Sequence, residues 1–147
     1  MGSISTEKEK MKANKKQCLI STALFATLAI AAQAEILVSQ ASIAATQQAG
    51  EPSAIFMQLE NNGNENVQLA FVESEIPARF ALHGMQQGRM TDLNTIEIPA
   101  HQRLSLKHGG QHIMVFDLPN SLKQGETFPI SLFFDNGEVV RTKAVVR

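Results

Sequence analysis

The chain has 147 residues, a formal net charge of −1 and a single cysteine, with 44% hydrophobic and 5% aromatic residues. This length suits one domain, and a charge near zero offers no basic surface of the kind that nucleic-acid-binding proteins use. We therefore expect one folded domain that does not bind nucleic acid.

The N-terminal region has the layout of a secretory signal peptide. Lysines within residues 12–16 precede an apolar run over residues 18–32, and the triplet Ala-Gln-Ala ends it at residue 34. A positive segment, a short apolar segment and an A-x-A site define such a peptide, and the apolar run is short of the roughly 20 residues that a membrane helix needs. We expect residues 1–34 to be removed on export, with an uncleaved anchor helix as the alternative. The polar start of the chain makes Met11 an alternative start of translation.

The only cysteine, Cys18, lies in this apolar run. A lipid anchor on Cys18 is not expected, because the apolar run follows the cysteine instead of preceding it. Residues 35–147 then have neither a disulfide nor a thiolate. They must be held together by a hydrophobic core alone, which a domain of this length can form.

Residues 35–147 have the pattern of an all-β domain, and we expect a Greek-key β-sandwich or barrel. Residues 39–53 are the least clear part, and we expect a first strand followed by a loop. The turn NNGNE separates two strand-like runs and predicts a hairpin, while Asn136-Gly137 suits a type I′ turn between the last two strands. The predicted strand regions are rich in apolar residues or alternate them with polar ones, and the last region contains two strands. They are residues 54–61, 66–74, 79–85, 89–93, 94–100, 102–110, 112–118 and 128–146.

The side chains that could bind a soft metal ion are concentrated in one part of the sequence. Alternation of faces in a strand places His112 and Met114 on one side and Ile113 and Val115 on the other, which is the natural core side. The concentration comprises all four histidines and three methionines: His83, His101, His108, His112, Met85, Met90 and Met114.

A second strand pair adds to this face. If a turn lies at Gln87-Gly88, Met85 is opposite Met90 and His83 is diagonal to Met90 on the same face. Thioethers favour Cu(I), and imidazole accepts either copper state. The grouping therefore predicts a Cu(I) site, with a chance surface grouping as the alternative.

The remaining candidates have simpler interpretations. Met57 is expected to fill the core, and His101 to be a solvated turn residue. His108 could reach a metal bound at His112, but it is not expected to be a ligand. The pair Gly109-Gly110 is expected to form a turn or bulge before the His112 strand.

Catalysis is not expected, because the chain contains no H-E-x-x-H, G-x-S-x-G, P-loop or C-x-x-C motif. Two further interpretations stay open. One is a metal-free secreted interaction module, which would need an exposed apolar patch or an open strand edge. The other is a copper scavenger or buffer without a dedicated acceptor.

The metal-ligand spacing resembles that of the PCu(A)C-type periplasmic copper chaperones. Their pattern is a His, ten residues, a Met, twenty-one residues and His-x-Met. Here Met90 is followed by 21 residues and then by His112-Ile113-Met114. The flanking segments IEIPA, LSLKHGGQHIM and LKQGETFPISLFFDNGEV are also similar to the family, and the resemblance covers roughly residues 36–147.

The chain departs from the family pattern at the first His. Only six residues separate His83 from Met90, so four residues are missing from the hairpin. Loss of two residues from each arm keeps His83 on the same face. His83 remains the expected first ligand, with Met85 as a substitute or additional ligand.

The resemblance implies a cupredoxin-like β-barrel in the periplasm that binds Cu(I) near its surface and passes it to a partner protein. The usual destination is the copper centre of a respiratory oxidase, or another copper chaperone, and a monomer suits a carrier. A blue-copper electron carrier would need a Cys ligand, which residues 35–147 lack. The implied copper ligands are His83, Met90, His112 and Met114.

Overall fold

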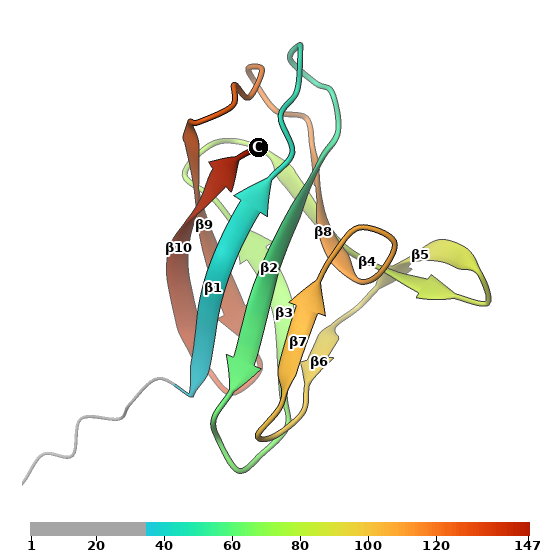
Figure 1. Cartoon of the computed structure of the whole chain (residues 1–147), viewed down its shortest axis with the longest axis vertical. Coiled ribbons are helices and arrows are strands. Elements are labelled where there is room, and N and C mark those ends of the chain that lie inside the picture. The colour runs from blue at the N-terminus through green and yellow to red at the C-terminus, as the bar shows by residue number, and fades with distance from the viewer. Residues whose placement is uncertain (1–34) are drawn as a thin grey trace, which may run out of the picture. The chain divides into compact units, whose positions relative to one another are not determined.

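The computed structural model describes residues 35–147, which form ten β-strands and no helix (Figure 1). The predicted signal peptide and Cys18 lie outside the described residues. Within the described part, no helix is present that could cross a membrane. The expected all-β fold is confirmed. The strands are β1 (Ile36–Ile43), β2 (Ser53–Asn61), β3 (Val67–Glu73), β4 (Arg79–Gln86), β5 (Arg89–Leu93), β6 (Ile96–Ile98), β7 (Arg103–Leu106), β8 (His112–Phe116), β9 (Thr127–Phe134) and β10 (Val139–Val146).

The strands form one sheet that curls into a nearly closed barrel. Their order is β5-β4-β8-β2-β1-β10-β9-β3-β6, and β7 pairs with β2 beside this path. β1 and β10 pair in parallel, whereas the pairs that flank the metal-ligand candidates, β4–β5 and β4–β8, are antiparallel. The order brings β8, late in the sequence, beside β2 and β4, and this long-range pairing positions the candidate site.

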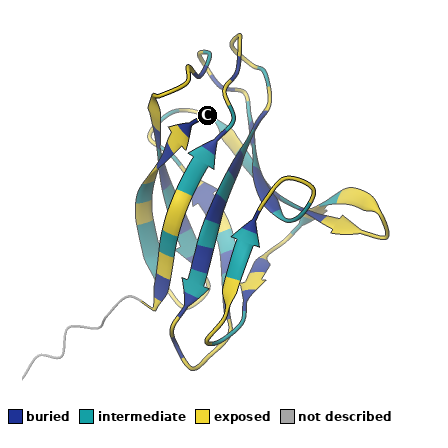
Figure 2. Cartoon of the chain, in the orientation of Figure 1, coloured by how far each residue is buried: buried dark blue, intermediate teal, exposed yellow. Residues whose placement is uncertain are grey.

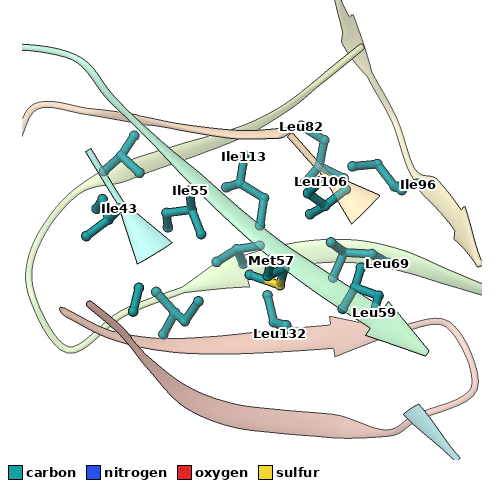
Figure 3. Packing of buried hydrophobic residues seen from close by; sticks show 14 of the residues in the cluster. Ile43, Ile55, Met57, Leu59, Leu69, Leu82, Ile96, Leu106, Ile113 and Leu132 are labelled. Atoms are coloured by element: carbon teal, nitrogen blue, oxygen red, sulfur yellow. The ribbon is translucent and has the colours of Figure 1, made fainter. Parts of the chain in front are cut away.

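The core lies inside the curl of the sheet. β2 alternates strictly between buried and half-buried residues along its length (Figure 2), as a strand with one core face should. From this strand Ile55, Met57 and Leu59 point inward toward Ile113 of β8 and Leu132 of β9 (Figure 3). Met57 is only 2% exposed, so its predicted role as core filler is confirmed.

The predicted hairpin between residues 54–61 and 66–74 is wrong. β2 pairs with β1, β7 and β8, whereas β3 pairs with β6 and β9. The NNGNE segment instead connects two parts of the sheet. Its first residue, Asn61, explains the difference, because its fully buried amide donates to the carbonyls of Glu65 and Ile98 at 2.8 and 2.9 Å and accepts from the Gly63 N–H at 2.9 Å.

Replacing Asn61 with alanine should destabilise the domain by roughly 2–3 kcal/mol, because buried backbone groups of Ile98 and Gly63 would lose their partner. Urea unfolding followed by circular dichroism measures this cost. Asn62→Ala is the matched control, since Asn62 is exposed. Equal stability of the two variants would contradict this role for Asn61.

The turn between β9 and β10 also differs from expectation, although the two strands pair as predicted. A type I′ turn needs two residues with positive φ, and here only Gly137 has one, at 86°. Phe134 and Glu138 close a three-residue loop through an N–H···O bond of 3.0 Å. The Asn136 side chain accepts from the Glu138 N–H at 2.9 Å, which holds this wider turn.

Candidate metal centre

Three neighbouring strands, β5, β4 and β8, bring the predicted ligands to one face of the sheet. His83 is paired directly with His112 across β4 and β8, and Met85 with Met90 across β4 and β5. Met114 follows His112 by two residues and therefore shares its face. Directly paired residues also share a face. The candidate ligands on this face are His83, Met85, Met90, His112 and Met114.

The opposite face of the same strands belongs to the core. Leu82 pairs with Ile113 across β4 and β8, and both are buried. Val115 is also fully buried, at 0% exposure. The predicted division of β8, with Ile113 and Val115 inward and the two candidate ligands outward, is therefore what the structure has.

The β4–β5 hairpin turns where the sequence predicted. Gln87 and Gly88 have positive φ values of 52° and 75°, which is the type I′ geometry of a two-residue hairpin loop. The hairpin projects from the body of the barrel (Figure 1). Near its tip Met85 and Met90 are 45% and 43% exposed, so the hairpin offers its thioethers to solvent and keeps His83 closer to the barrel.

The two imidazole rings lie close together. The ring centroids of His83 and His112 are 5.7 Å apart, with an angle of 67° between the ring planes. A metal bound to an imidazole nitrogen at about 2.0 Å lies about 3 Å from the ring centroid, so two rings that share a metal have centroids up to about 6 Å apart. The separation of His83 and His112 is compatible with a shared metal ion.

His112 is more buried than its place on the outer face suggests. Its exposed fraction is 7%, and the Phe56 ring of β2 lies beside it, with centroids 6.1 Å apart. Its Nδ1 lies 2.9 Å from the carbonyl oxygen of Gly110. Because a carbonyl only accepts, Nδ1 carries the proton, and Nε2 of the neutral ring keeps a lone pair for a metal.

His83 has a carboxylate partner that sequence reasoning missed. Its Nε2 lies 2.6 Å from Oδ1 of Asp92, which is the residue directly opposite His83 on β5. The signal was available, because Asp92 follows Met90 by two residues and must share its face. Because a carboxylate is a harder ligand than a thioether or an imidazole, a soft-metal donor pattern does not include Asp92.

The other histidines lie at the edge of this region or outside it. His101 is an exposed turn residue with a φ of 58°, and its Nε2 lies 3.0 Å from Oδ1 of Asn64. His108 is exposed, and its ring is edge-on to Phe56 at a centroid distance of 6.5 Å. The Gly110 N–H donates to the carbonyl of Lys107 at 3.0 Å, which is the turn expected before β8.

The donor set restricts the metal. Among residues 35–147 no three His, Cys, Asp or Glu side chains are grouped so that they could hold a metal ion. The other donor atoms on this face are the thioethers of Met85, Met90 and Met114. Thioethers bind soft ions such as Cu(I) better than zinc or other harder ions.

Comparisons with known proteins agree on the kind of domain. Residues 36–146 match the LpqE-like family, described as "Putative lipoprotein LpqE-like". No curated protein sequence matches the chain.

Solved structures of PCuAC domains are similar to the described domain. The copper-bound PCuAC domain from PmoF2 superposes with a TM-score of 0.69 at 19% identity, covering 80% of this chain and 96% of that one. The apo PCuAC domain from PmoF1 gives 0.68 at 19%, covering 78% and 94%. The solution structure of CuI-DR1885 from Deinococcus radiodurans gives 0.63 at 26%, covering 76% of each chain.

These likenesses confirm the cupredoxin-like fold and the resemblance to the PCuAC copper chaperones. They extend over the strands that carry the candidate ligands, since the family match spans β1 to β10. The chain belongs to the LpqE-like family, and its described residues have the fold of a PCuAC domain.

Proposed function

We propose that the protein is a Cu(I) carrier whose ligands are His83, Met90, His112 and Met114. The observation that carries the proposal is the pairing of His83 with His112, with both thioethers on the same face. Two imidazoles and two thioethers make a neutral, soft donor set, which is suited to Cu(I).

Related structures support this proposal. One PCuAC neighbour is described as copper-bound and the Deinococcus protein as carrying CuI. The present chain keeps the His-x-Met pair and a Met at the corresponding spacing, although its hairpin is shorter. The common fold and the shared spacing together favour the same metal in the same oxidation state.

The position of the ligands suits delivery of the metal. Met90 is exposed near the hairpin tip, where an incoming thioether or imidazole of another protein could displace it. The acceptor would be a copper-binding protein, either an oxidase copper centre during assembly or another copper chaperone. This role requires no catalysis, and the protein is proposed to be a monomeric carrier and not an enzyme.

Export to the periplasm is part of the proposal. It is supported by the signal-peptide layout of residues 1–34 and by the family's description as a lipoprotein. The word lipoprotein in the family description points to a lipid anchor as the alternative to a cleaved signal peptide. Such an anchor would be attached to Cys18, the only cysteine in the sequence. Mass spectrometry of the exported protein separates the two cases, because cleavage after Ala34 removes Cys18 whereas lipidation retains it.

An anaerobic titration of residues 35–147 with Cu(I), in competition with a chromophoric chelator, tests copper binding. We expect one tightly bound equivalent. The protein has no Trp or Tyr, so its concentration must come from amino-acid analysis. A protein that cannot compete with the chelator would contradict the proposal.

That outcome would favour a metal-free interaction module. Its structural support is Phe71, which is 49% exposed and stacked on Phe133 at a centroid distance of 4.4 Å. β5 and β6 also end the path of hydrogen-bonded strands. If copper binds but no acceptor removes it faster than a small chelator does, the scavenger interpretation replaces that of a carrier.

The affinity for Cu(I) should fall as the pH is lowered from about 7.5 to about 5, because imidazole binds metal only when it is neutral. Thioethers do not titrate, so a site made of Met90 and Met114 alone would give a flat profile. The Asp92 carboxylate is a further charged group that faces His83. Competition titrations across this range measure the slope, and a flat profile would remove His83 and His112 from the ligand set.

A further inference from the structure

Asp92, a charged residue beside the proposed copper site, is not part of the ligand set. Asp92 of β5 lies directly opposite His83 in the β4–β5 ladder, and its Oδ1 is 2.6 Å from His83 Nε2. The carboxylate is 85% exposed, whereas the His83 side chain is 17% exposed. The partly covered imidazole is therefore held from its solvent side by an exposed carboxylate.

This contact determines which nitrogen of His83 is free. An ionised carboxylate only accepts hydrogen bonds. The Nε2–H group of His83 therefore donates a hydrogen bond to Asp92, and the neutral ring keeps its lone pair on Nδ1. His112 has the opposite arrangement, since its Nδ1–H donates to the Gly110 carbonyl at 2.9 Å. The two neighbouring rings are thus fixed in complementary tautomers, each by its own hydrogen-bond partner.

We propose that Asp92 is a positioning residue that holds His83 in the Nε2–H tautomer and so makes Nδ1 the nitrogen that binds copper. Metal-binding histidines commonly donate their second N–H to a carboxylate or carbonyl, which fixes the ring and its tautomer. In this chain Asp92 and Gly110 supply one such partner to each imidazole. The assignment of Nδ1 as the copper-binding nitrogen rests on the proposed copper function. The assignment of the tautomer does not, because the contact between His83 and Asp92 is made without metal.

The first test needs no copper. Long-range proton–nitrogen NMR spectra of the metal-free protein at a pH of about 8, where free imidazole is neutral, distinguish the two tautomers of each ring. We expect the Nε2–H form for His83 and the Nδ1–H form for His112. Asp92→Ala should convert His83 to a mixture of tautomers and leave His112 unchanged, while Asp92→Asn should retain the Nε2–H form, because the amide oxygen still accepts.

The second test measures Cu(I) affinity in the same variants. Loss of such an outer partner typically weakens metal binding by about 10- to 100-fold, so we expect that loss in Asp92→Ala and recovery of most of it in Asp92→Asn. Asp117→Ala is the matched control, since Asp117 is another exposed aspartate, paired with Arg79. It should change neither the tautomers nor the affinity.

The outcomes separate this inference from the copper proposal. A His83 ring that is in the Nδ1–H form, or that ignores Asp92→Ala, would overturn the positioning role whatever copper does. Unchanged or tighter copper binding in Asp92→Ala would also overturn it, because Asp92 would then be idle or would compete with the metal. The expected tautomers in a protein that binds no copper would leave the His83–Asp92 pairing intact and reject the copper function.

Discussion

Replacing Met114 with leucine should lower the Cu(I) affinity by at least about 100-fold. Loss of an outer-sphere partner of a metal ligand weakens binding by up to about 100-fold, and loss of a direct ligand should weaken it at least as much. Met114 shares its face with His112, two residues away. On either side it is paired with a small residue, Ala54 of β2 and Ala81 of β4. These alanines are small neighbours for its thioether, and the other methionines of residues 35–147 lie in the core or on the β4–β5 hairpin.

Leucine is the informative substitution because it has nearly the volume of methionine and should cost less than about 1.5 kcal/mol of stability. Met57→Leu is the matched control. Met57 is 2% exposed in the core, so this variant removes a thioether from the protein without touching the proposed site. Competition titrations with a Cu(I) chelator should show the loss only in Met114→Leu. Equal affinities in the two variants would exclude Met114 as a ligand.

The period of two in the strands was enough to predict which candidate side chains share the outer face. Counting alternate residues placed Ile113 and Val115 inside and the candidate ligands outside, and the Gln87-Gly88 turn fixed the register of Met85 and Met90. These are local properties of a strand and its turn. The pairing of His83 with His112 depends on β4 and β8 meeting, which the alternation alone could not establish.

Long-range contacts account for what the sequence did not predict. The NNGNE segment has the composition of a hairpin turn, but the Asn61 amide donates to the Ile98 carbonyl. Ile98 is distant from Asn61 in the sequence, so local residue patterns could not predict this contact. The burial of His112 likewise depends on Phe56, which reaches it only through the pairing of β2 with β8. Local patterns gave the faces of strands, whereas tertiary neighbours decided burial and connection.

The second large effect concerns the shortened hairpin, where His83 and Met85 compete for the role of first ligand. His83 lies directly opposite His112. Met85 lies two residues further along β4, which is about 7 Å at the rise of a strand. Met90 is opposite Met85, but a diagonal neighbour about 7–8 Å away is still within reach of a long side chain. The geometry therefore favours His83 as the ligand, with Met90 reaching back toward it.

His83→Ala should accordingly weaken Cu(I) binding by at least about 100-fold, as expected for a direct ligand. Met85→Ala, the matched control from the same face of β4, should leave the affinity close to that of the unmodified protein. Met85 is 45% exposed, so its removal should not unfold the hairpin. The His83 side chain is only 17% exposed, so circular dichroism must show that His83→Ala keeps the fold. The reverse result, a large loss in Met85→Ala and none in His83→Ala, would move the site to the hairpin tip. Copper would then bind between the thioethers of Met85 and Met90. In that case the shortening of the hairpin by four residues would have exchanged the first imidazole ligand for a thioether.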